Sequence, residues 1–466
     1  MKTIANYHKE FERGEYTPLE LLEECLRNID PEINAFITVT EELARESLKR
    51  SKKGRLRGIP IAVKDNINIK GVPTTCGSGI LRGFIPPYSA TVIERIESEG
   101  GIFIGKTNLD EFGMGSSTER SFYGPTKNPY DLSRVPGGSS GGSAAALASG
   151  SAIISLGSDT GGSVRQPASY CGLVGLKPTY GRVSRYGLVA FASSLDQIGI
   201  IGRNSEDVGL LLSVIAGYDK RDSTSSTNEV EDYENLEFPQ KGIKIGIPEE
   251  YFEEIDEEVY NKVMEIKEAL EKEGFSFKKV SLPSTDYIIS TYQVISYAEA
   301  SSNLARYDGV RYGLRKEGKD FLETIRKSRE EGFLPEVKRR ILVGTFVLSS
   351  EAIAEYYERA DLIRKIITWE FEECFKEVDY LFTPATPTPA FPIGERTDDP
   401  IRMHIPDRLT AGANLSGIPA IVAPAGFVGH LPIGYQIMGR HFDEKGLLSL
   451  VKLVEKIKPF KGLSYE

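Results

Sequence analysis

Two serine and glycine clusters and one isolated lysine carry the residue types in this sequence that could act together in catalysis. The clusters are GGSSGGS at 137–143 and SDTGGSVR at 158–165, and Lys64 closes the segment GIPIAVK. A serine hydroxyl becomes a useful nucleophile when a neighbouring base takes its proton, and that base is usually histidine. The four histidines, however, all lie more than 120 residues from either cluster. We therefore take Lys64 as the candidate base of a serine hydrolase.

The first cluster, taken alone, allows two other interpretations. A run of glycine and serine is typical of flexible linkers. The same letters also match G-x-S-x-G twice, centred on Ser139 and on Ser140, which is the nucleophile pattern of α/β-hydrolases. The helix-forming segment AAALAS follows directly, so the end of the cluster would lie at a helix N-terminus, where negative charge is favoured. This setting favours a functional loop.

The second cluster offers a set of backbone donors in a loop between regular elements. Glycine at two successive positions permits backbone conformations that other residues rarely adopt and allows a ligand to approach closely. The N–H groups of Thr160, Gly161, Gly162 and Ser163 could converge as a nest, the usual geometry of an oxyanion hole.

The elements that must position these residues alternate between helix and strand, as in an α/β protein. Thr17 and Glu20 form a capping box that opens an amphipathic helix. The short segment ending at Lys64 is apolar and rich in branched residues, which predicts a buried strand. Near the C-terminus, YLFTPA, AIVAPAG and LPIGYQIMG predict strands, and we expect these to rejoin the first sheet.

We expect one domain over residues 1–466. Its predicted parts are a helical lead-in over about 1–54, a catalytic core over about 55–220, a helical elaboration over about 250–378, and returning strands with a C-terminal helix over about 379–466. The polar segment 222–241 predicts a surface loop. The helical period over 351–377 contains the single tryptophan, Trp369, which we expect in the core.

Composition excludes several classes of protein. The net charge of -10 has the wrong sign for a chain that grips nucleic acid through its phosphates. Four scattered cysteines without a CxxC pair predict neither a disulfide framework nor a zinc site. No run of 18 apolar residues and no secretory segment occur. We expect a soluble cytoplasmic protein that binds no membrane and no metal.

Taken together, Lys64, GGSSGGS, GSDTGGSVRQPA and the following CGLVGLKPTYGRVSRYG resemble the amidase signature family of Ser-Ser-Lys hydrolases over nearly the whole chain. The resemblance implies an α/β/α sandwich whose central mixed sheet is flanked by helices. It implies that Ser163 is the nucleophile, that Ser139, in a cis peptide, is the bridging serine, and that Lys64 is the base. The oxyanion loop would then comprise Thr160, Gly161, Gly162 and Ser163.

The chemistry adds a condition on Lys64. A lysine with its ordinary pKa of about 10.4 is protonated at neutral pH, so it can act as a base only where burial or neighbouring groups lower that pKa. The end of an apolar strand predicts such burial.

Three downstream segments, at 296–313, 336–350 and 398–421, resemble a narrower group, the A subunits of the Asp/Glu-tRNA(Asn/Gln) amidotransferases. This resemblance implies a protein that hydrolyses glutamine, or asparagine less well, and passes the ammonia to a partner. Partner B and C subunits would complete a heterotrimer, with no cofactor in this chain and with ATP, Mg²⁺ and most contacts to the misacylated tRNA on the B subunit. Glu-tRNA(Gln) and Asp-tRNA(Asn) both remain open as acceptors.

The same resemblance implies a pocket for the glutamine that contains Tyr292, Arg340 and Asp407. An arginine and an aspartate suit the carboxylate and the ammonium of an α-amino acid. Arg339 remains open as the alternative to its neighbour. Around Asp407 the sequence IPDRLTAG differs from the bacterial members of the group on both sides of the aspartate.

Three other functions remain open. A stand-alone amidase of the same fold would act on a small free amide and would need no amino-acid pocket. An α/β-hydrolase would use Ser139 or Ser140 and would need a histidine beside it. A purely structural component of a complex would retain the site without activity.

Overall fold

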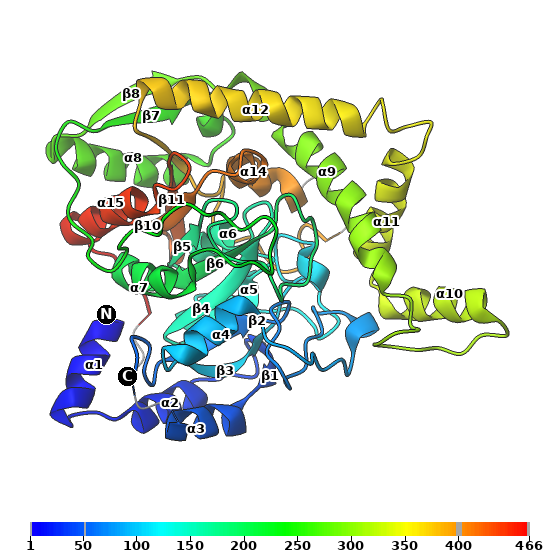
Figure 1. Ribbon diagram of the computed structural model, residues 1–466. Helices are drawn as coiled ribbons and strands as arrows, with labels where there is room; N and C mark the ends of the chain where they lie inside the picture. Colours follow the sequence, from blue (N-terminus) through cyan, green and yellow to red (C-terminus); the bar gives the residue numbers. More distant parts are fainter. Residues whose placement is uncertain (1, 51–52, 398–402, 464–466) are drawn as a thin grey trace.

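A large mixed β-sheet forms the centre of the computed structural model, which describes residues 2–50, 53–397 and 403–463 (Figure 1). Among the described residues, eleven strands hydrogen-bond in the order β1-β3-β2-β4-β6-β5-β10-β11-β9-β7-β8. The strands are β1 (Phe36–Val39), β2 (Pro60–Lys64), β3 (Ile102–Thr107), β4 (Ile154–Asp159), β5 (Val174–Lys177), β6 (Gln197–Gly202), β7 (Lys244–Pro248), β8 (Ser276–Val280), β9 (Tyr380–Pro384), β10 (Ala420–Val428) and β11 (Leu431–Met438).

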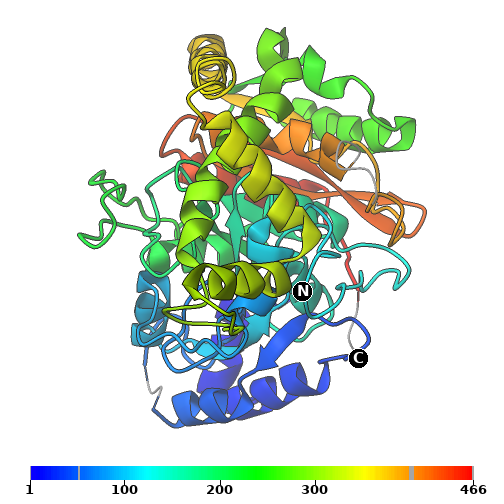
Figure 2. The ribbon, with the colours of Figure 1, turned by 90° about the vertical axis from the view of Figure 1, so that its right-hand side faces the viewer.

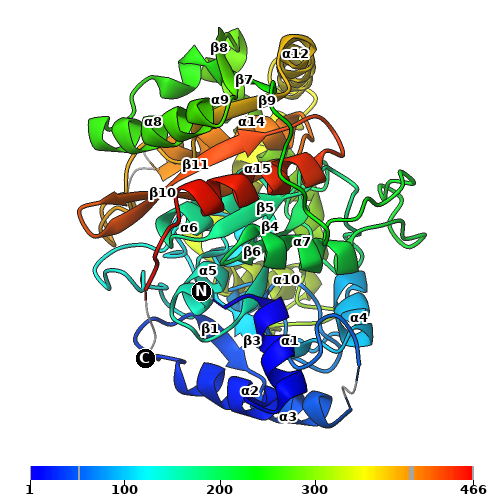
Figure 3. The same ribbon diagram turned by 90° about the vertical axis from the view of Figure 1, so that its left-hand side faces the viewer.

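Helices cover both faces of this sheet. They are α1 (Ile4–Arg13), α2 (Pro18–Arg27), α3 (Glu41–Arg50), α4 (Thr91–Ser98), α5 (Gly141–Ala148), α6 (Arg165–Tyr170), α7 (Ser205–Ile215), α8 (Glu257–Lys272), α9 (Ile288–Asn303), α10 (Phe321–Gly332), α11 (Pro335–Val347), α12 (Tyr357–Glu377), α14 (Arg408–Leu415) and α15 (Glu444–Ile457). In Figure 3, α7 and α15 lie on the side of the sheet that faces the viewer. The expected α/β sandwich with a mixed central sheet is confirmed.

The sheet joins the two ends of the sequence. Strand β10 pairs antiparallel with β5, and β11 and β9 extend the sheet beyond it. The strands predicted near the C-terminus therefore rejoin the first sheet, as expected. The predicted strand that ends at Lys64 is β2, which runs parallel to both β3 and β4. The boundaries proposed inside the single domain stay predictions.

Glycines let the short helix α6 lie close to the sheet. A Cβ at Gly157 or Gly199 would come within 2.8 or 3.0 Å of the Val164 side chain, and a Cβ at Gly175 within 2.6 Å of Ala168. Because these positions carry no side chain, the loop between β4 and α6 can approach the strands that support it.

The helical region 288–377 lies outside the central sheet and comes to the front in Figure 2. Strand β8 lies within the segment proposed as a helical elaboration, where it pairs with β7. One expectation for this part of the chain was wrong. Trp369 is not in the core, since 57% of it is exposed. Helix α12 begins at Tyr357 and buries Ile367 and Phe371, so Trp369 lies on its other face.

The described residues can be compared with what the sequence indicated about membrane spans, metal sites and disulfides. Within 2–50, 53–397 and 403–463, no helix is both long and apolar enough to cross a membrane. In the same residues, no group of three or more His, Cys, Asp or Glu side chains could hold a metal ion. All four cysteines are buried and unpaired. Of the segment 398–421, residues 398–402 lie outside the described residues.

Candidate active site

Lys64 lies at the end of β2, and its side chain is completely buried. The ammonium Nζ is 2.8 Å from the hydroxyls of Ser139 and Ser140 and 3.0 Å from that of Ser158. Burial lowers the pKa of Lys64 to about 7, although nearby aspartates, Asp110 first among them, oppose this shift. Lys64 therefore meets the condition that the sequence set, because a large fraction of it is neutral near pH 7.

The first cluster forms the junction between a loop and α5, and all of its residues are buried. The interpretation as a flexible linker is therefore wrong. The Gly138–Ser139 peptide bond is cis. The Gly138 N–H donates to Gln166 Oε1 at 2.8 Å, and a Cβ at Gly138 would come within 2.3 Å of Asp110 Oδ2. The absence of a side chain thus lets this loop pass against Asp110 and present Ser139 to Lys64.

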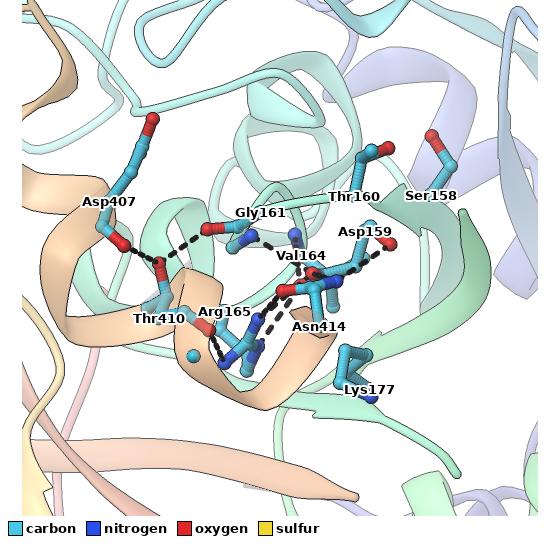
Figure 4. Close-up of polar contacts among 12 residues, drawn as sticks. Ser158, Asp159, Thr160, Gly161, Val164, Arg165, Lys177, Asp407, Thr410 and Asn414 are labelled. Atoms are coloured by element: carbon cyan, nitrogen blue, oxygen red, sulfur yellow. Dashed lines mark hydrogen bonds and ion pairs between the residues drawn. The ribbon is translucent and has the colours of Figure 1, made fainter. Parts of the chain in front are cut away.

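The second cluster forms the turn between β4 and α6, and the carboxylate of Asp159 organises it (Figure 4). The N–H groups of Gly162 and Val164 donate to this carboxylate at 2.9 and 3.1 Å. Gly162 is therefore already engaged within the turn. The N–H groups of Thr160, Gly161 and Ser163 have no acceptor among the described residues. The oxyanion hole stays a prediction, and these three groups are its candidate donors.

A buried network of hydrogen bonds also stabilises this turn. Arg165 is completely buried, and its guanidinium donates to both carboxylate oxygens of Asp159 at 3.1 and 3.0 Å. It also donates to Asn414 Oδ1 at 2.7 Å, and the Asn414 amide donates back to Asp159 at 2.9 Å. Burial alone would raise the pKa of Asp159, but the charge and hydrogen bonds of Arg165 hold it well below its usual range. The turn thus depends on α14, a distant part of the sequence.

The candidate nucleophile Ser163 lies in this turn with 7% of its surface exposed. Its carbonyl accepts a hydrogen bond from the Ser140 N–H at 3.1 Å, which connects the two clusters directly. Thr160, at the start of the turn, donates through its hydroxyl to Asp196 at 2.7 Å. Burial raises the pKa of Asp196 to about 6. Ser163 thus lies beside the loop that presents Ser139 to Lys64, and the catalytic roles of Lys64, Ser139 and Ser163 stay predictions.

Two of the three predicted pocket residues, Tyr292 and Asp407, lie beside the same turn. The Tyr292 ring packs over Gly161, where a Cβ would come within 2.8 Å of the ring. Asp407 accepts hydrogen bonds from the Ser116 hydroxyl at 2.8 and 3.0 Å. Thr410, one turn beyond Asp407, donates to the Gly161 carbonyl at 2.6 Å (Figure 4). The candidate amino-acid pocket and the candidate oxyanion loop are therefore directly adjacent.

The geometry distinguishes between the two neighbouring arginines. Arg340 is completely buried and donates to Glu336 at 2.8 Å. The Arg339 side chain is 37% exposed and is held by Glu336 and by the Tyr297 hydroxyl. Arg340 also contacts one ring nitrogen of His404, and the other ring nitrogen contacts Asp407. The arrangement favours Arg340 as the arginine of the pocket.

A family model described as Amidase matches residues 20–448 of this chain. The chain belongs to the amidase signature family. The A subunit of the glutamyl-tRNA(Gln) amidotransferase of Carboxydothermus hydrogenoformans is 53% identical over 443 residues, which cover 93% of this chain and 91% of the relative. The crystal structure of the A subunit of the glutamyl-tRNA(Gln) amidotransferase from Thermotoga maritima is 42% identical, covers 98% of this chain and 95% of its own, and superposes with a TM-score of 0.82.

The fold itself does not separate the kinds of amidase. The structure of 6-aminohexanoate cyclic dimer hydrolase is 25% identical, covers 98% of this chain and 97% of its own, and has a TM-score of 0.87. This fold similarity is no lower than that to the Thermotoga protein, while the sequence identity is much lower. The sequence identity, and not the fold, therefore favours the amidotransferase group of amidases.

Sequence reasoning missed His404, because it considered histidines only as partners of the serines. This residue lies between Arg340 and Asp407 in the candidate pocket of the amidase. The other histidines contact the Arg57 carbonyl, Asp131 and the Ser416 carbonyl. Among the described residues, no histidine hydrogen-bonds to a serine of either cluster. An α/β-hydrolase mechanism would therefore lack its histidine base here.

Proposed function

We propose that this amidase is the glutaminase component of a tRNA-dependent amidotransferase, in which glutamine is hydrolysed through an acyl ester on Ser163. The observation that carries the proposal is the buried Lys64, whose pKa is lowered to about 7 and whose ammonium contacts Ser139 at 2.8 Å. The high identity to proteins named as A subunits of glutamyl-tRNA(Gln) amidotransferases supports the substrate and the assembly.

The proposed reaction begins with a proton relay. Neutral Lys64 accepts the proton of Ser139, Ser139 accepts that of Ser163, and Ser163 Oγ attacks the carboxamide carbon of glutamine. Backbone N–H groups of the turn at 160–163 stabilise the negative charge on the carbonyl oxygen. As the C–N bond breaks, the proton returns through Ser139 to the leaving nitrogen, which departs as ammonia. Water then hydrolyses the ester by the same relay and releases glutamate.

The ammonia is proposed to travel to a partner. A B subunit with ATP and Mg²⁺ would activate the carboxylate of Glu-tRNA(Gln) or Asp-tRNA(Asn), and a C subunit would complete the heterotrimer. The cytoplasm, where these tRNAs are charged, is the proposed location. The presence of Arg340 and Asp407 on either side of His404 favours this proposal over a stand-alone amidase for small amides, because such a substrate offers them neither a carboxylate nor an ammonium.

Ammonia release from glutamine tests the proposal. We expect that the partner subunits with misacylated tRNA stimulate release strongly, and that Ser163→Ala lowers it by at least about a thousandfold, since the nucleophile is lost. Ser151→Ala is a matched control, because Ser151 is also buried but donates to the Asn28 carbonyl, outside the site.

Two results would contradict the proposal. Full activity of the isolated chain on small amides, with no response to partners, would favour the stand-alone amidase. Unchanged activity of Ser163→Ala would remove Ser163 as the nucleophile.

A further inference from the structure

His404 joins the two charged residues of the candidate pocket. Its Nε2 lies 3.0 Å from Arg340 Nη2, and its Nδ1 lies 2.7 Å from Asp407 Oδ2. Only 1% of the residue is exposed, so both ring nitrogens are satisfied within the protein. The imidazole precedes the short helix Ile405–Asp407 and reaches across to α11.

These two contacts fix the protonation of the ring. A guanidinium has only donors, so Arg340 must donate to Nε2, and Nε2 therefore carries no proton. The remaining proton of a neutral imidazole must then be on Nδ1, where it is donated to the Asp407 carboxylate. The geometry assigns His404 as the neutral tautomer with hydrogen on Nδ1.

While they contact the His404 ring, Arg340 and Asp407 can still bind a ligand. The Nη1 atom of Arg340 is buried and has no hydrogen-bond partner among the described residues. The guanidinium is held in place by Glu336 on Nε and by the Tyr297 ring, 4.9 Å from its centre. The carboxylate of Asp407 faces the opposite end of the imidazole. His404 thus sets the distance between a free guanidinium donor and a carboxylate.

We propose that His404 is a positioning residue that holds Arg340 ready for the carboxylate and Asp407 ready for the ammonium of an α-amino acid, and that it does so only while its Nε2 is unprotonated. The inference rests on the proposed glutaminase function and deepens it. A second proton would place an N–H group against the N–H groups of Arg340, and the contact would break. Glutamine binding should therefore weaken wherever the ring takes up a second proton.

The other charged and titratable groups around this cluster differ in their response to pH. On α11, burial would raise the pKa of Glu336, but Arg339 and Arg340 lower it to about 2, so it stays ionised. On α9, burial raises the pKa of Tyr292 far above its usual range, so it stays neutral. Asp196, with its pKa raised to about 6 by burial, faces Thr160 and can also titrate. Variants of His404 must therefore separate its effect from that of Asp196.

Glutamine binding to the Ser163→Ala protein, measured by titration calorimetry from about pH 5.5 to 8.5, tests the proposal without turnover and without the contribution of Lys64 as a base. We expect affinity to fall at least about tenfold wherever His404 takes up a second proton, since one charge-assisted contact is lost. His404→Gln and His404→Asn each keep one of the two contacts, and both should bind glutamine more weakly at pH 8.5 and with little pH dependence. His430→Gln, at an exposed histidine, is the matched control.

A spectroscopic measurement gives a readout that a merely structural role would not produce. In protein labelled with ¹⁵N at its four histidines, one imidazole at pH 8.5 should show the Nδ1–H tautomer, and His404→Gln should remove that signal. An Nε2–H tautomer for His404, or variants with the pH dependence of the parent, would overturn the proposal. Absence of glutamine binding at every pH, with the tautomer as assigned, would contradict the proposed function and the role of His404 in it.

Discussion

Lys64 and Lys106 are buried in neighbouring strands, and their partners differ in kind. Lys106 forms an ion pair with Asp65 at 2.9 Å. Among the described residues, Lys64 has only neutral oxygens of serines within hydrogen-bond distance. A buried ammonium without a paired carboxylate loses its hydration and gains little in return, so its neutral form is favoured. The lack of a paired carboxylate therefore makes Lys64 suited to accept a proton.

The same burial should be measurable as a pH-dependent cost in stability. Folding lowers the pKa of Lys64 from 10.5 to about 7. Between these values the unfolded chain holds a proton that the folded chain releases, so the cost is greatest at and below pH 7 and vanishes above 10.5. We expect the free energy of unfolding of Lys64→Met, relative to the parent, to fall by about 1.4 kcal/mol for each pH unit between about pH 7.5 and 9.5.

Denaturant unfolding of the two proteins at several pH values provides the measurement. Lys177→Met is the control, because burial also lowers the pKa of Lys177 to about 7 while its ammonium contacts only the Pro178 carbonyl among the residues described. Both variants should show the same pH trend in stability, and Lys64→Met should lose far more glutaminase activity. A stability difference for Lys64→Met that does not change with pH would mean that Lys64 stays charged when folded.

At the scale of elements, one helix serves both the candidate pocket and the candidate oxyanion loop. Asp407, Thr410 and Asn414 recur at helical spacing along α14 and the short helix before it, so they lie on one face. That face meets the turn between β4 and α6 (Figure 4). A shift of α14 would therefore move the amino-acid pocket and the backbone donors together.

A pair of substitutions at Thr410 tests this coupling. Thr410→Val removes the hydroxyl that donates to the Gly161 carbonyl, and Thr410→Ser keeps it. Since a hydrogen bond contributes about 1 kcal/mol, we expect Thr410→Val to lower kcat for glutamine hydrolysis roughly fivefold with a smaller change in KM, and Thr410→Ser to restore most of it. Steady-state kinetics provide the measurement. Equal kcat values for the two variants would show that this hydroxyl does not hold the oxyanion loop.

Much of the first half of the fold could be predicted because its signals are local. Thr17 and Glu20 form the capping box of α2 as expected, and the apolar segment ending at Lys64 is a buried strand. The face of α12 could not be predicted, since an amphipathic period does not say which side a neighbour covers, and Trp369 proved exposed. His404 was missed because its partners lie on α11 and on its own segment, while the serines suggested a different role.

The spacing on α14 was nevertheless a usable signal. An aspartate, a threonine and an asparagine at helical spacing, in a helix whose residues 409–415 are all buried, need polar partners inside the protein. The sequence could have predicted that this helix faces a polar site, although not which site.

At the scale of the whole molecule, the site exists only when distant parts of the chain share one sheet. Lys64 comes from β2, Ser163 from the turn after β4, and Asp407 from a segment just before β10. Strand β5 pairs with β10 and joins these parts through the sheet. The helical region between β8 and β9 contributes Tyr292 and Arg340. The elaboration therefore supplies two of the three candidate pocket residues, while the strands and turns of the sheet supply the candidate nucleophile and base.

The overall charge sets a limit on how this molecule can take part in tRNA chemistry. A net charge of -10 repels the phosphates of a nucleic acid, whose affinity for proteins depends largely on basic side chains and released counterions. We expect the isolated chain at physiological salt to bind tRNA more weakly than about 100 µM, the weak end of non-specific binding. Addition of the proposed B subunit should produce tight binding, measured by gel retardation of labelled tRNA. Salt-sensitive micromolar binding by the isolated chain would instead place part of the tRNA contact on this protein.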